Sequence, residues 1–128
     1  MPVLIILAAI CVSWWSARTA SAVEQYVRDE VIELIPMVLD NPDIVERMVV
    51  NPALYTPVSN SIVAMSSVWS GNKKDLSVKV TSGDDPRYGD GSATHVALVD
   101  INGIPVLGLR VLCHGTGEPM LIAGVWTP

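Results

Sequence analysis

The 128-residue sequence contains no phenylalanine, and its aromatic residues are limited to four tryptophans and three tyrosines. Large apolar ligand pockets depend on aromatic side chains, so this scarcity disfavours a dedicated pocket of that kind. Basic residues are also few, because thirteen Asp and Glu outnumber eight Lys and Arg and give a formal net charge of −5. Nucleic-acid binding needs a basic stripe, so the sequence predicts no nucleic-acid partner.

Cysteine is nearly absent, with Cys11 in an apolar leader and Cys113 near the other end. Removal of the leader leaves one thiol, so we expect Cys113 to behave as a buried apolar residue or a free thiol. No Cys and His residues have metal-ligand spacing, and no nucleophile elbow or phosphate-binding glycine loop is found. The sequence therefore predicts no metal, no cofactor and no enzymatic activity.

What the sequence does contain is an apolar run over residues 3–15, in which only Ser13 is polar. This length is typical of the hydrophobic part of a signal peptide and falls short of the ~20 residues that span a bilayer. Ala20 and Ala22 have the spacing of small residues at a cleavage site. The first interpretation is therefore a signal peptide that is cleaved before Val23.

A retained anchor is the second interpretation, because no Lys or Arg precedes the apolar run. Trp14 and Trp15, followed by Arg18, are typical of residues at a membrane interface. A buried core helix is the third interpretation. Under the first two, residues 1–22 direct the chain to a membrane, and we expect a membrane-associated or exported, extracytoplasmic protein.

Residues 23–128 are long enough for one domain with one core. Apolar residues at steps of three and four predict an amphipathic helix over residues 23–39, and Pro36 should make it kink or end near Ile35. Asn41, followed by a proline, predicts the start of a short second helix over residues 43–50.

Strands are predicted in the C-terminal half, by alternation of apolar and polar residues or by β-rich runs between turn residues. The stretches are residues 62–70, which also fit a helix, and residues 76–81, 93–101, 104–113 and 120–126. Helices followed by strands predict an α+β fold, with both helices packed on a four- to five-stranded antiparallel sheet. This element order resembles cystatin-like folds and pilin-like proteins. Ile5 stands where pilin-like proteins carry a glutamate, and the chain is assigned to neither family.

Asn102-Gly103 separates two of these strands and is typical of a two-residue hairpin turn. With Ile101 opposite Ile104, the register makes His95 and Arg110 direct cross-strand neighbours on the solvent face. Such a pair beside small residues predicts a ligand- or partner-binding site for an anion or a carboxylate. A solvated polar end of the sheet is the alternative.

Two functions are compatible with these features. The first is a non-enzymatic structural or accessory subunit of a membrane-associated or exported assembly, which binds protein partners and touches the membrane through its N-terminal segment. Trp14, Trp15 and Trp126 would then be exposed contact residues. The second is an exported small-ligand (anion) binding domain with a cystatin-like helix-on-sheet architecture and a cavity between helix and sheet.

Overall fold

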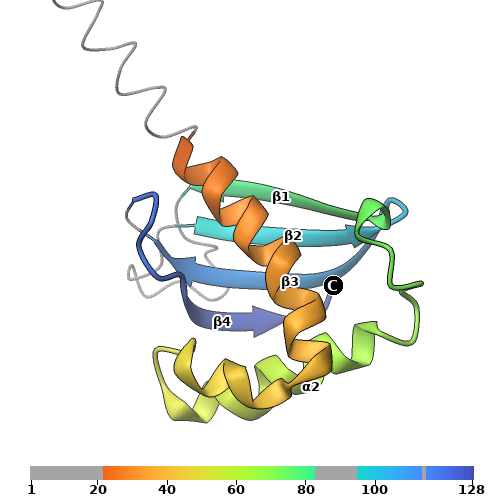
Figure 1. Cartoon of the computed structure of the whole chain (residues 1–128), viewed down its shortest axis with the longest axis horizontal. Helices are drawn as coiled ribbons and strands as arrows, with labels where there is room; N and C mark the ends of the chain where they lie inside the picture. Colours follow the sequence, from red (N-terminus) through yellow and green to blue (C-terminus); the bar gives the residue numbers. More distant parts are fainter. Residues whose placement is uncertain (1–21, 83–94, 114) are drawn as a thin grey trace, which may run out of the picture.

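Four antiparallel strands form the sheet in the computed structural model of the chain, which describes residues 22–82, 95–113 and 115–128 (Figure 1). The strands are β1 (Leu76–Ser82), β2 (His95–Ile101), β3 (Ile104–Leu112) and β4 (Leu121–Trp126), and each pairs with its neighbours in chain order. Helices pack against this sheet, so the predicted α+β fold is confirmed, with four strands.

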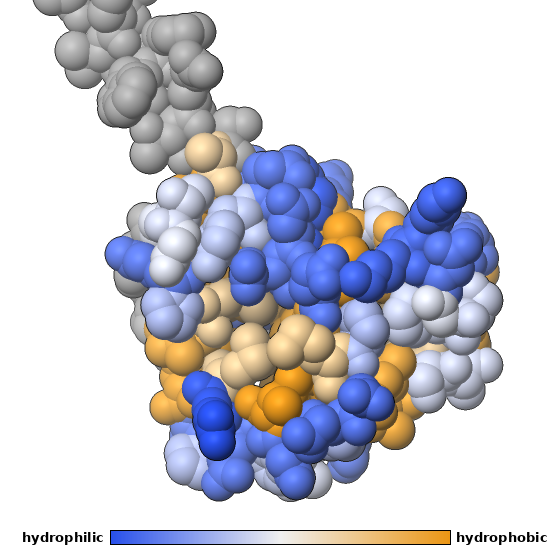
Figure 2. All heavy atoms as spheres, viewed as in Figure 1, coloured by the Kyte–Doolittle hydropathy of each residue, from blue (hydrophilic) through white to orange (hydrophobic). Residues whose placement is uncertain are grey.

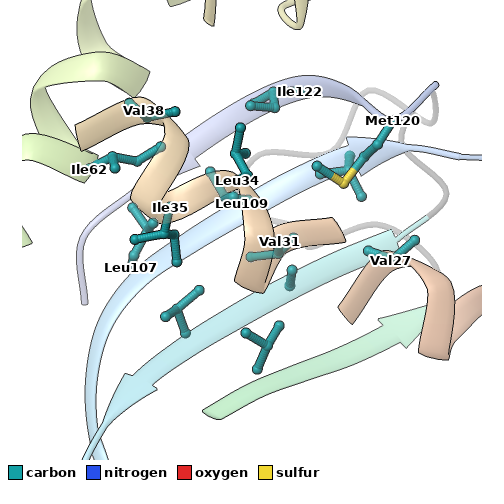
Figure 3. Packing of buried hydrophobic residues seen from close by; sticks show 14 of the residues in the cluster. Val27, Val31, Leu34, Ile35, Val38, Ile62, Leu107, Leu109, Met120 and Ile122 are labelled. Atoms are coloured by element: carbon teal, nitrogen blue, oxygen red, sulfur yellow. The ribbon is translucent and has the colours of Figure 1, made fainter. Parts of the chain in front are cut away.

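A long helix (residues 22–40) crosses one face of the sheet diagonally (Figure 1). Its apolar stripe is buried, as the predicted spacing requires, and consists of Val23, Val27, Val31, Leu34, Ile35 and Val38. The stripe packs against fully buried residues of the sheet such as Leu107, Leu109 and Ile122 (Figure 3). The core of the molecule is therefore the layer between this helix and the sheet.

The long helix continues through Pro36 to residue 40, so the predicted helix over residues 23–39 is confirmed, and of the two alternatives near Ile35, a kink or an end, the end does not occur. Proline inside a helix removes one hydrogen bond and crowds the preceding turn, at a cost of about 3 kcal/mol. Val38 lies beyond the proline and is fully buried, and the Asn41 amide continues the pattern by donating to the Met37 carbonyl at 2.9 Å. Burial of the last turn thus outweighs the local preference to stop.

The predicted second helix is a 3-10 helix, η1 (Pro42–Arg47). The Asn41 side chain accepts a hydrogen bond from the Asp43 amide at 3.2 Å, and Pro42 takes the first helical position. The predicted start is therefore confirmed, whereas the helix ends three residues before the predicted Val50.

Residues 62–70 do not form a strand, so that prediction is wrong. Their first part belongs to α2 (Tyr55–Met65), which follows a short 3-10 turn, η2 (Pro52–Leu54). Val58, Ile62 and Met65 are buried on one face of α2 at steps of four and three. Short apolar stretches fit both periods, and packing against the rest of the protein decides between them.

The outer edge of β4 is closed by the segment that follows η1. The Val50 amide donates to the Ile122 carbonyl at 3.0 Å, and the Ile122 amide donates to the Met48 carbonyl at 2.6 Å. Val49 thereby forms a parallel bridge with Ile122. The first half of the chain is thus hydrogen-bonded to the last strand.

Candidate functional site

A small apolar groove lies at the hairpin end of the sheet, where β2 turns into β3. Its volume is about 160 Å³, and its lining residues are Val68, Ile101, Asn102, Ile104 and Val106. Ile104 is 65% exposed and Val68 is 62% exposed, which are the highest values among the large apolar residues that the structure describes. We call this surface the hairpin groove.

The Asn102-Gly103 turn sets the position of Ile104. Both turn residues have positive φ values, 50° and 83°, as the predicted two-residue turn requires. Ile101 pairs with Ile104 as predicted, and the Asn102 amide donates to the Asp75 carbonyl at 3.1 Å. The hairpin tip is therefore tied to the start of β1, and Ile104 is held at the surface.

Val68 is presented by the irregular turns that follow α2. The Ser66 hydroxyl donates to the Val63 carbonyl and the Ser67 hydroxyl to the Ala64 carbonyl, which fixes the end of the helix. One residue later, the Trp69 indole N–H donates to the Asn72 carbonyl at 2.9 Å. With both neighbouring segments anchored, Val68 projects from a defined position.

The hairpin groove is too small for an ordinary small-molecule ligand, because such pockets have volumes of roughly 300–1,000 Å³. It is better suited to one apolar side chain of a protein partner.

The hairpin groove was not predicted from the sequence. The available signal was Ile104 directly after the Asn-Gly turn, where a polar residue is expected at a solvent-facing position. Exposed apolar residues are also visible on the face that carries the long helix (Figure 2).

The predicted pairing of His95 with Arg110 is wrong. His95 pairs with Val111 and lies on the face that the long helix covers, whereas Arg110 pairs with Val96 on the opposite face. Both residues are buried, with 7% and 6% exposure. The two side chains therefore do not form one site.

A β-bulge between Val99 and Asp100 causes this difference. Val99 pairs with Leu107 and Asp100 pairs with Pro105, so the extra residue is Val106 on β3. It shifts the register of the remaining strand by one position, and a shift of one moves each side chain to the other face. The register predicted from the turn holds for Ile101 and fails beyond the bulge. Ala97 and Val99 join the core as a result, where they are fully buried.

Two glycines shape the sheet face opposite the long helix. Gly108 pairs with Trp126, and Gly124 pairs with Arg110. A Cβ atom at Gly108 would overlap three ring atoms of Trp126, and a Cβ at Gly124 would lie 3.6 Å from the Arg110 side chain. Each large side chain thus extends over a glycine of the neighbouring strand. Trp126 is only 8% exposed, so its predicted role as an exposed contact residue is wrong.

Cys113 is 1% exposed, in agreement with the predicted buried residue, and its thiol donates to the Gly115 carbonyl at 3.4 Å. Burial raises the pKa of the thiol, and the nearby carboxylates of Glu118 and Glu30 act in the same direction. Tyr26 is partly buried against the core cluster that includes Cys113, and its hydroxyl donates to the Glu118 carbonyl at 3.0 Å. A thiol with a raised pKa is a poor nucleophile at neutral pH.

We expect the free energy of unfolding to fall as the pH rises above about 8.5, the usual pKa of a cysteine in an unfolded chain. Above that pH the unfolded chain releases the thiol proton, whereas the folded chain retains it because the pKa of Cys113 is raised. Urea unfolding at about pH 7.5 and about pH 9.5, below the usual tyrosine pKa, measures the difference. The Cys113→Ala variant should show a smaller decline, and an equal decline would contradict the assignment.

Trp14, Trp15 and Arg18, the predicted membrane-interface residues, lie outside the described residues. Among the helices that are described, none has both the length and the apolar character to cross a bilayer. Within the same ranges, no three His, Cys, Asp or Glu side chains are grouped as metal ligands would be.

Comparison with known proteins gives no match to a family model, a curated protein or a solved structure. The function is therefore inferred from the surfaces of this chain alone.

Proposed function

We propose that this chain is a non-enzymatic structural or accessory subunit of a membrane-associated or exported assembly, and that it acts by protein–protein contact at the hairpin groove. The exposure of Ile104 and Val68 beside the groove carries the proposal. Burying apolar surface against a partner stabilises a complex by about 25 cal/mol per Å². The hairpin holds Ile104 in water and the turns after α2 hold Val68 there, so this surface is suited to that use.

Two reactive side chains of the described residues are buried, which supports a non-enzymatic function. Cys113 and His95 are 1% and 7% exposed, and the pKa of the thiol is raised rather than lowered. A catalytic cysteine needs access to substrate and a lowered pKa. Residues 1–22, with their apolar run, support the membrane-associated or exported location.

The alternative, an exported anion-binding domain, receives less support. It required His95 and Arg110 side by side, and the bulge places them on opposite faces. It also required a cavity between helix and sheet. In that layer Ile35, Leu107 and Leu109 are fully buried and belong to one core cluster (Figure 3).

Ile104→Glu and Val68→Glu should each weaken the association of the chain with its assembly at least about tenfold, because a carboxylate would be desolvated in an apolar contact. The measurement is the fraction of chain that sediments with large complexes from solubilised membranes and exported material of the native host. Melting temperatures of the purified variants should stay unchanged, because both side chains are exposed.

Val50→Glu is the matched control. Val50 is 45% exposed and lies beside Ile122 near the start of β4, at the end of the sheet away from the hairpin. It should leave the association intact. Retention of all three variants in the large complexes would refute the hairpin groove as the contact surface.

A further inference from the structure

The two edges of the sheet differ. The outer edge of β4 is paired with Met48 and Val50, whereas no strand lies beyond β1 among the described residues. An open edge presents backbone N–H and C=O groups that can pair with another chain. The outer edge of β1 is therefore a second possible contact surface, separate from the hairpin groove.

The register identifies which groups of β1 point outward. Antiparallel residues alternate between hydrogen-bonded and non-hydrogen-bonded pairs. Asp75 accepts from Asn102, so Ser77, Lys79 and Thr81 also direct their backbone groups toward β2. Val78 and Val80, at the alternate positions, direct theirs outward.

Arg28 of the long helix confirms this orientation, because its Nε donates to the Val78 carbonyl at 2.9 Å. Its Nη1 also donates to the Gln25 side chain at 2.5 Å. A side chain thus takes the place that the amide of an added strand would occupy.

Most of the cations that the structure describes lie near this edge. Six Lys and Arg residues fall within the described ranges, and four of them lie on β1 or beside it: Arg28, Lys73, Lys74 and Lys79. Carboxylates lie there as well, and each has a partner: Glu33 forms an ion pair with Lys73 at 2.8 Å, Glu24 accepts a hydrogen bond from Ser82, and Asp75 accepts one from Ser70. Arg28, Lys74 and Lys79 form no ion pair within the described residues, so they can attract an anionic partner. The protein as a whole carries a formal charge of −5.

We propose that the outer edge of β1 binds an extended acidic segment of a partner protein, which adds to the sheet as a fifth strand. Its backbone would pair with Val78 and Val80, and one of its amides would replace Arg28 at the Val78 carbonyl. The released guanidinium would then pair with a carboxylate of the segment. A second copy of this chain fits less well, because edge-to-edge pairing would bring together two sets of the same cations.

The probe is a fluorescent peptide of about eight alternating Thr and Glu residues, a typical strand length that places every carboxylate on one face. Fluorescence polarisation with the full-length chain in mild detergent should show saturable binding that weakens with added salt. Lys79→Glu should weaken binding at least about tenfold. Arg47→Glu, which makes the same charge change on η1, should have a much smaller effect.

Two N-methylated peptides test the backbone pairing. In one peptide the odd amides are methylated, and in the other the even amides, so that only one of the two loses the hydrogen bonds toward β1. We expect one peptide to bind and the other to fail. Absence of saturable binding, equal binding of both methylated peptides, or equal effects of Lys79→Glu and Arg47→Glu would overturn the proposal.

The experiments distinguish a failure of this proposal from a failure of the proposed function at the hairpin groove. Ile104→Glu should leave peptide binding at β1 unchanged, and Lys79→Glu should leave the hairpin groove intact. A chain that loses its assembly on Ile104→Glu and never binds the acidic peptide would support the proposed function and refute the edge site.

Discussion

Ile35→Ala should reduce the free energy of unfolding by about 2–5 kcal/mol, because the substitution removes three methyl or methylene groups from a filled core and leaves a cavity. Ile35 is fully buried in the cluster that joins the long helix to the sheet (Figure 3). Small domains are stable by only about 5–15 kcal/mol, so this change should also lower the melting temperature markedly. Urea unfolding followed by circular dichroism measures it.

Met37→Ala is the control on the same helix. Met37 is two residues away and 56% exposed, so its truncation should change stability by less than about 0.5 kcal/mol. Equal losses for the two variants would mean that the long helix does not pack on the sheet through the predicted face.

Gly108→Ala should destabilise the protein by about 1–3 kcal/mol through overpacking. The new methyl group would occupy the position of the Trp126 ring, so the indole has to move from the neighbouring strand. Trp126 is buried against this position, and its displacement should expose it to water. The measurements are urea unfolding and the emission of Trp126 in a background in which the other three tryptophans are replaced by phenylalanine.

Gly124→Ala is the matched control, since its added Cβ would meet Arg110 at the ordinary contact distance of 3.6 Å. A double-mutant cycle of Gly108→Ala with Trp126→Leu isolates the clash, because the smaller side chain should recover part of the loss. Additive effects of the two substitutions would show that the ring of Trp126 is not what excludes a side chain at Gly108.

Local patterns predicted those elements whose signal is complete within a few residues. The Asn102-Gly103 turn depends on backbone conformations that few other residue pairs adopt, and the Asn41 cap depends on one side chain and one amide. The long helix was predicted from the spacing of its apolar stripe. In these cases the neighbouring residues in the sequence are also the interaction partners.

The errors arise where distant contacts decide. Ile62 is helical because α2 packs on the same core. At Pro36 the local pattern left a kink or an end open, and burial of Val38 favours continuation of the helix. The bulge at Val99 and Asp100 has no residue signature in the sequence, so the predicted pairing of His95 with Arg110 failed. The hairpin groove was missed for the same reason, since Val68 and Ile104 meet only in the folded chain.

The bridge between Val49 and Ile122 has a consequence for the order of folding. The segment around Val49 leaves the ribosome long before β4 is synthesised. Until β4 is present, the backbone groups of Met48 and Val50 have no strand to pair with. Contacts between such distant parts slow folding, because a long loop has to close before they form. Export in an unfolded state would leave the loop closure to be made but remove the unpaired interval during synthesis, since the whole chain would be present when the sheet assembles.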